Sequence, residues 1–301
     1  MESAPAVIAL YGPTATGKST VAGILRDRLA GEVISADSAA LYAGLETLTA
    51  APSYPARLTA CVPRDSEVSV GEYQRLAHTA IDDVLEGGAV PLVVGGTGLY
   101  LRAALSSFTF PPAPAEGERE RWSAVYDELG AEGAHVLLES RDPAAALRVH
   151  ANDRRRVIRA LELSEAGSSL APPVDRLWSD DMRHETVLVG LDLPLDLLDA
   201  RIAVRVEEMV AAGVVAEARA AWAEPLSPTA RKVLGLEEFA TLPEREAVEA
   251  VVTATRRLAR YQRKWLRRLP VVATLAADRP PEEIADAIVA LAGTGERLSR
   301  R

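Results

Sequence analysis

The chain has 301 residues and a net charge of −9, and it is 48% hydrophobic and 26% charged, as is typical of globular enzymes. It has no apolar run of about eighteen residues and no basic segment ahead of an apolar run at its start, so we expect no membrane span and no signal peptide. The one cysteine, Cys61, excludes a disulfide framework and a cysteine-based metal site. Together these features predict a cytoplasmic enzyme.

Short apolar segments alternate with helical patterns along most of the chain. The predicted strands are residues 6–12, 31–38, 89–100, 186–194 and 270–277, and the predicted helices include 18–30, 72–88 and one or two helices over 195–222. Apolar strands that alternate with helices are typical of a parallel sheet covered on both faces. The predicted fold class is therefore α/β.

Two proline-rich stretches, residues 108–117 and 169–176, interrupt this alternation. Between them the pattern is helical and contains no candidate strand. We predict a helical insertion domain at 111–181, set into a P-loop α/β core made of 1–110 and 182–301 with C-terminal helices.

The first predicted strand leads directly into a phosphate-binding motif. The segment "GPTATGKS" fits the pattern GxxxxGK[ST] and lies between a strand and a helix, as the motif requires. Its glycines let backbone N–H groups surround phosphate oxygens, the helix N-terminus adds partial positive charge, and Lys18 adds a full charge. The predicted diphosphate-binding residues are Gly12, Pro13, Thr14, Ala15, Thr16, Gly17, Lys18, Ser19 and Thr20, and the Ser19 hydroxyl can ligate Mg²⁺.

P-loop ATPases and GTPases usually carry an apolar strand that ends in an acid, but here "PLVVGG" ends in glycine, and the only strand-end acids are Asp37 and Asp192. A motor or switch protein is thereby disfavoured, and a group-transfer enzyme is favoured. Asp37 ends the second strand, where ligands of open α/β sheets bind, near the turn at 95–98. Position alone leaves two roles for Asp37 open, namely accepting a proton from an acceptor substrate or capping the following helix.

Two segments are strongly basic although the whole chain is acidic. Residues 256–268 carry seven basic side chains and no acid, and residues 148–159 carry five arginines and one acid. Local charge decides nucleic-acid contact, so both are candidate RNA-binding segments. In the first, an apolar stripe at helical spacing is predicted to face the core: Leu258, Tyr261, Trp265 and Leu269.

Six strings occur together in the order and spacing of one enzyme family. They are "GPTATGKST", "ISADSAALY", "TAAPS", "VGGTGLYLRAAL", "NDRRRVIRALEL" and "TRRLARYQRKWLRRL", and they extend over roughly residues 5–270. In these strings the chain resembles the tRNA dimethylallyltransferases, also called tRNA isopentenyltransferases.

The resemblance implies a reaction and roles for particular residues. The loop would hold dimethylallyl diphosphate, and the acceptor would be N6 of adenine 37 in the anticodon loop of tRNA. Asp37 would be the general base and Thr97 would contact the reacting groups, while Lys18, Arg219 and Ser19 with Mg²⁺ would hold the leaving pyrophosphate. The implied tRNA contacts are Asp37, Ser38, Ala39, Ala40, Arg155, Arg156, Val157, Ile158 and Arg159. The implied partners are tRNA and dimethylallyl diphosphate, with no membrane and no protein partner.

The chain departs from the family pattern at two places. Ala56 and Arg57 stand where the family usually has two histidines, and Leu236 and Glu237 stand where it has Tyr-Lys. These departures affect the acceptor contacts more than the diphosphate site. Three alternatives remain open: an adenylate (cytokinin-type) isopentenyltransferase, a P-loop small-molecule kinase, and an RNA-binding relative without catalysis.

Overall fold

A six-stranded parallel sheet forms the centre of the computed structural model, which describes residues 7–108, 110–111, 114–115, 117–171 and 176–293. The strand order is β3-β2-β4-β1-β5-β6, and every neighbouring pair is parallel. The strands are β1 Val7–Tyr11, β2 Gly31–Ser35, β3 Ala56–Arg57, β4 Val90–Gly95, β5 Thr186–Asp192 and β6 Ala273–Ala276. The α/β prediction is confirmed, and β3 is the strand that the sequence pattern missed, because two residues carry no periodicity.

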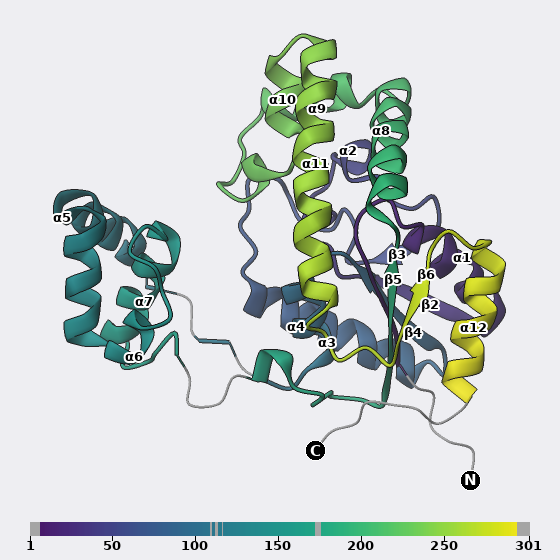
Figure 1. The fold of residues 1–301 in the computed structure, drawn as a ribbon, viewed down its shortest axis with the longest axis horizontal. Coiled ribbons are helices and arrows are strands. Elements are labelled where there is room, and N and C mark those ends of the chain that lie inside the picture. The colour runs from purple at the N-terminus through teal and green to yellow at the C-terminus, as the bar shows by residue number, and fades with distance from the viewer. Residues whose placement is uncertain (1–6, 109, 112–113, 116, 172–175, 294–301) are drawn as a thin grey trace. The chain divides into compact units, whose positions relative to one another are not determined.

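Helices cover both faces of the sheet (Figure 1). Side chains of α1 and α12 join those of β1 and β5 in one buried cluster, and α3 and α4 pack together on the other side. The predicted helix at 195–222 is two helices, separated at Gly213 with a φ of 93°. The α-helices in the same part of the chain as the sheet are α1 Lys18–Leu29, α2 Glu46–Thr49, α3 Val70–Glu86, α4 Gly98–Leu105, α8 Leu195–Ala211, α9 Val214–Trp222, α10 Leu236–Thr241, α11 Glu244–Leu266 and α12 Pro281–Gly293. None of the helices in the described ranges is both long and apolar enough to cross a membrane.

The chain divides into two compact units, and the smaller one is helical in its described part. Unit one comprises Met1–Phe108 and Trp178–Arg301, and unit two comprises Thr109–Leu177. Unit two contains α5 Glu118–Arg141, α6 Pro143–Ala146 and α7 Arg154–Glu165. Its own apolar core includes Trp122, Tyr126, Leu138 and Leu161, so its packing is independent of the sheet.

The end of β4 lies so close to the residue after β2 that only glycine fits there. A Cβ added at Gly95 would lie 2.1 Å from the carbonyl oxygen of Ala36. The backbone of Ala36 donates to the Val94 oxygen at 2.8 Å, so the contact belongs to the sheet ladder itself and cannot relax locally.

Gly95→Ala is therefore expected to destabilise the fold, because the new methyl meets backbone and not a flexible side chain. We expect a loss of about 3 kcal/mol in the free energy of unfolding, measured by urea denaturation. Gly293→Ala is the matched control, since a Cβ there meets nothing within 4 Å. A Gly95→Ala variant as stable as this control would contradict the assigned strand register.

Candidate active site

The phosphate loop between β1 and α1 holds its shape through its own bonds. Gly17 and Ala15 have φ angles of 83° and 64°, the left-handed geometry that turns successive N–H groups toward one point. The Thr16 hydroxyl donates to the Pro13 oxygen at 2.8 Å, and the Lys18 ammonium donates to the same oxygen at 2.7 Å. These bonds hold the loop in one conformation at the N-terminus of α1, where an anion is favoured.

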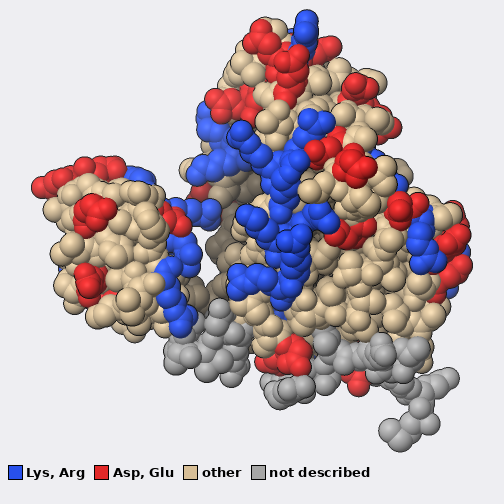
Figure 2. Space-filling view, in the orientation of Figure 1, with Lys and Arg blue, Asp and Glu red and all other residues tan. Residues whose placement is uncertain are grey.

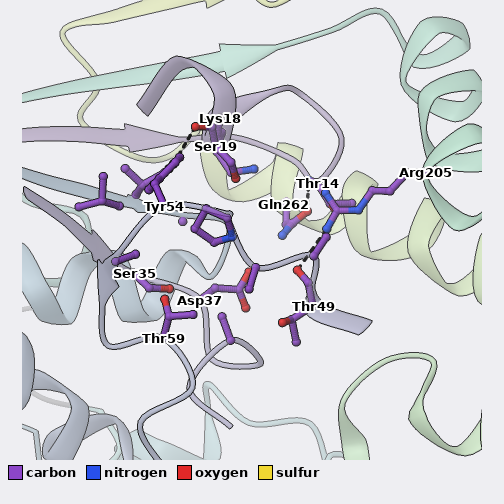
Figure 3. Close-up of a pocket in the computed structure, with 18 residues that line it drawn as sticks. Thr14, Lys18, Ser19, Ser35, Asp37, Thr49, Tyr54, Thr59, Arg205 and Gln262 are labelled. Atoms are coloured by element: carbon purple, nitrogen blue, oxygen red, sulfur yellow. Dashed lines mark hydrogen bonds between the residues drawn. The ribbon is translucent and has the colours of Figure 1, made fainter. Parts of the chain in front are cut away.

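A cavity of about 90 Å³ opens beside this loop (Figure 3). Lys18 and Ser19 from α1 face it, together with Asp37 after β2 and Arg205 from α8. Residues distant in the sequence meet here because the strands end at one edge of the sheet. The remaining polar lining comes from Thr14, Ser35, Thr49, Tyr54, Thr59 and Gln262.

The Asp37 carboxylate faces the cavity and also accepts a hydrogen bond from the backbone. Its Oδ1 accepts from the backbone N–H of Ala39 at 3.0 Å. The next residue, Ser38, donates its backbone N–H to the Thr97 hydroxyl at 3.2 Å. The next helix begins only at Glu46, so the helix-capping role is wrong: one carboxylate oxygen of Asp37 supports a turn instead, while the group faces the cavity.

The structure brings Arg205 to the cavity and leaves Arg219 outside it. Arg219 is exposed on α9, whereas Arg205 donates to the Thr49 oxygen at 3.3 Å and lines the cavity. Burial lowers the pKa of Arg205, and the Asp37 carboxylate opposes that shift. The pyrophosphate contact implied for Arg219 fits Arg205 better, and the clue in the sequence is an arginine beside the buried stripe of Ile202 and Val206.

Lys18 is held in an unusual electrostatic state. Its pKa is lowered to about 7, chiefly by burial and also by the Arg205 guanidinium, while the Asp37 carboxylate acts in the opposite direction. Two cations thus face one carboxylate in the absence of ligand. An incoming polyanion would reverse this imbalance and favour the protonated amine.

Tyr54 is a cavity residue that the sequence motifs did not single out. Its hydroxyl donates to the Ser19 oxygen at 2.7 Å, and its ring lies 4.7 Å from the Arg26 guanidinium. Burial raises the pKa of Tyr54 to about 12, so the hydroxyl stays protonated and keeps this bond. Tyr54 directly follows the "TAAPS" string, and this position is the only signal in the sequence that could have identified it as a cavity residue.

The candidate tRNA residues separate into exposed and buried ones. Arg155 and Arg156 are exposed on α7, and Arg159 donates to the buried Glu162 at 3.0 Å. The side chains of Val157 and Ile158, for which the resemblance implies tRNA contacts, lie in the core of unit two, and those contacts stay a prediction. On a helix, residues adjacent in sequence point about 100° apart, so a contiguous string cannot all face one ligand.

The other residues implied to contact tRNA lie in unit one. Ser38 and Ala39 are half-buried beside Asp37, and Ala40 lines the cavity.

The apolar stripe predicted for 256–268 is also partly wrong. Leu258 and Tyr261 are 36% and 57% exposed, while the buried stripe runs through Val251, Ala259, Gln262 and Leu266. The basic side chains on the opposite side of α11 form a band over that helix (Figure 2). Its exposed members are Arg257, Arg260, Lys264, Arg267 and Arg268.

Two of the positions that depart from the family pattern, Arg57 and Leu236, are held in the structure of unit one. Arg57 donates to Glu32 at 2.7 Å and pairs with Asp83 at 3.3 Å, so it joins the sheet edge to α3. Leu236 is fully buried at the start of α10, and Glu237 is exposed.

The donor chemistry of the cavity bears on Mg²⁺. Ser19 presents a hydroxyl to the cavity, a hard oxygen ligand of the kind that Mg²⁺ prefers. No cluster of three His, Cys, Asp or Glu side chains suited to a metal occurs in the described ranges. The residues fit an ion whose remaining ligands are substrate phosphate and water.

Most of the chain matches one known protein family. The family model described as IPP transferase matches residues 40–269. The chain belongs to the IPP transferase family. Among curated members, the tRNA dimethylallyltransferase of Salinispora arenicola is 42% identical over 287 residues, covering 91% of this chain and 83% of that protein. That of Streptomyces griseus subsp. griseus is 39% identical, covering 88% of both.

Solved structures of IPP transferases have the same fold. The tRNA isopentenylpyrophosphate transferase of Bacillus halodurans has a TM-score of 0.67 at 29% identity, covering 96% of this chain and 97% of that one. The Staphylococcus epidermidis enzyme has a TM-score of 0.68 at 26% identity, covering 96% and 99%. A eukaryotic dimethylallyltransferase acting on tRNA has a TM-score of 0.77 at 23% identity, covering 95% and 79%, and shows the shared fold.

The depressed pKa of Lys18 predicts proton uptake when a diphosphate monoester binds. At pH 8 the free amine is mostly neutral, because its pKa is about 7. Binding of dimethylallyl diphosphate, itself fully ionised at that pH, should raise this pKa and take up close to one proton. Calorimetric titrations in buffers of different ionisation enthalpy measure the uptake, and Lys18→Met is the control that should abolish it. Binding without proton uptake by the unmodified protein would contradict the assignment.

Proposed function

We propose that this IPP transferase transfers a dimethylallyl group from dimethylallyl diphosphate to N6 of adenine 37 in the anticodon loop of tRNA. The observation that carries the proposal is the shared cavity of Lys18 and Asp37. A diphosphate cradle and a carboxylate face each other there, as a group transfer to an amine requires. The family's curated members are named for the same reaction.

The chemistry divides between the two sides of the cavity. The allylic C–O bond breaks, its electron pair leaves with pyrophosphate, and a bond forms between the allylic carbon and N6. Lys18, Arg205 and the loop N–H groups stabilise the charge that develops on the leaving group. Asp37 accepts the proton that N6 loses, and Thr97 holds the turn beside it.

Mg²⁺ would be held by Ser19 and would supply Lewis-acid stabilisation of the leaving pyrophosphate when bound. Asp37 faces the same cavity, but we assign it to the acceptor as general base and not to the metal as a ligand. The protein's own cations, Lys18 and Arg205, neutralise the rest of the diphosphate charge.

The exposed basic band of α11 supports a polynucleotide acceptor. A free nucleotide would need no extended cationic surface, whereas an anticodon stem presents a row of phosphates. Arg155 and Arg156 on α7 offer a second exposed basic group. Adenine 37 would leave its stack to reach the cavity, at a cost of a few kcal/mol that these phosphate contacts offset.

The test is incubation with radiolabelled dimethylallyl diphosphate and either tRNA or AMP. Label in tRNA adenine supports the proposal. Label in AMP alone would identify a cytokinin-type enzyme, and ATP consumption with a metabolite but no prenyl transfer would identify a kinase. Binding of tRNA without transfer would identify an RNA-binding relative that has lost catalysis.

Asp37→Asn is expected to separate the base role from the turn role. The amide still accepts the Ala39 bond, so the unfolding free energy should change by less than about 1 kcal/mol. It cannot accept a proton, so the single-turnover rate should fall by about 10²- to 10⁴-fold. Asp37→Ala is the control that loses both roles and about 1 kcal/mol of stability. A stable Asn variant with the normal rate would remove Asp37 from the mechanism.

Neutralising Lys264 and Arg267 together should weaken tRNA binding and its salt dependence. Both side chains are exposed on α11, so their replacement by Gln leaves the core untouched. Each lost phosphate contact lowers the log–log salt slope by about 0.7–0.9, giving a change of about 1.5 in a filter-binding series. Replacing Arg245 and Arg279 by Gln is the matched control, since these side chains are exposed outside the band. Equal slopes for the two variants would show that the band is only a solvated surface.

A further inference from the structure

Gln262 lies on the buried face of α11, and its polar side chain is part of the lining of the active-site cavity. It is 6% exposed and sits in the apolar stripe between Ala259 and Leu266. The Thr14 backbone N–H donates to its Oε1 at 2.8 Å, and its Nε2 donates to the Gly96 oxygen at 3.0 Å. Its own backbone oxygen accepts from the Tyr11 hydroxyl at 3.1 Å. Burial of an amide is costly unless both ends are bonded, and here both are.

The orientation of this amide follows from its two partners. Thr14 offers a donor and Gly96 offers an acceptor, so the oxygen must face the loop and the nitrogen must face the turn. No other uncharged side chain of this length supplies one acceptor and one donor from the same planar group. Glutamine at this position is thus matched to the two backbone atoms that it joins.

These two backbone atoms belong to opposite sides of the proposed reaction. Thr14 lies in the loop that would hold the diphosphate donor. Gly96 directly precedes Thr97, whose hydroxyl accepts from Ser38 beside Asp37 on the acceptor side. The Gln262 amide therefore spans from the donor cradle to the acceptor turn (Figure 3 shows its bond to Thr14).

The helix that carries Gln262 is fixed against the same edge of the sheet. A Cβ on Gly190 of β5 would lie 2.5 Å from the Leu266 side chain, and one on Gly98 would lie 2.2 Å from the Trp265 ring. Arg263 also donates to Asp192 at the end of β5 at 2.7 Å. A side chain on so closely packed a helix is a rigid support for both loops.

We propose that Gln262 is a positioning residue that sets the separation between the diphosphate loop and the acceptor turn. The inference rests on the proposed function, because it concerns the distance between donor and acceptor in that reaction. A displacement of about 1 Å between reacting groups can cost about 100-fold in rate while each substrate still binds. Loss of the bridge should therefore slow transfer far more than it weakens either substrate's binding.

The primary test is Gln262→Met compared with Gln262→Ala. Methionine keeps the length and volume of the side chain but loses both bonds, whereas alanine also leaves a cavity. If the bridge positions the loops, both variants should lose about 10- to 100-fold in single-turnover rate at saturating substrates. The alanine variant should unfold at a lower temperature than the methionine variant. Dissociation constants for dimethylallyl diphosphate and for tRNA should change less than about threefold in Gln262→Met.

A packing role alone gives a different pattern. Gln262→Met would then keep a single-turnover rate within about twofold of the unmodified enzyme, and only Gln262→Ala would be slow, which would overturn the proposal. A loss of substrate affinity that fully accounts for the slower turnover would overturn it as well. Thr255→Val is the matched control, since Thr255 is 8% exposed on the same buried stripe but does not line the cavity. Its rate should stay within about twofold of the unmodified enzyme.

The experiment also separates this inference from the proposed function. If the unmodified protein transfers no label to tRNA, the proposed function fails before any variant is compared. If it transfers label and Gln262→Met does so equally fast, only the positioning role fails.

Discussion

The site depends on one constraint, which is that all neighbouring strands of the sheet are parallel. Parallel strands end at a common edge, so the loops after β1, β2 and β4 converge there although their residues are far apart in the chain. The first loop supplies Lys18, the second supplies Asp37 and the third supplies the Gly95–Gly98 turn. Close backbone approach, as between Gly95 and Ala36, lets these loops share bonds and not merely lie near one another.

The buried basic side chains at this edge of the sheet favour a negatively charged ligand. Lys18 and Arg205 both have a lowered pKa because burial and, for Lys18, the neighbouring cation disfavour their charged forms. The single carboxylate of Asp37 does not balance them. A polyanion in the cavity would favour the charged forms of both side chains, which supports the diphosphate substrate proposed above.

The helix α11 packs against this edge of the sheet with one face and is exposed to solvent on its opposite face. Its buried stripe presents Gln262 to the phosphate loop and to the acceptor turn, while Lys264 and Arg267 remain exposed on the basic band. A helix has enough circumference for both tasks, since residues two apart point about 200° from each other. The same 23-residue helix thus packs against the diphosphate site and carries the surface proposed for tRNA.

The sequence by itself determined the features that local pattern encodes: the P-loop after a buried strand, the other long strands, Asp37 at a strand end and the two basic segments. It could not select Arg205 over Arg219, detect the two-residue β3, or tell that Val157 and Ile158 are core residues. It also placed the buried stripe of α11 partly on the wrong residues and gave no sign of Gln262. The strand β3 is too short to carry a periodic pattern, and each of the others depends on which face of a helix meets the rest of the chain. That choice is made by contacts between residues distant in the chain, such as Tyr11 and Gln262, which are 251 positions apart, and only the tertiary structure decides it.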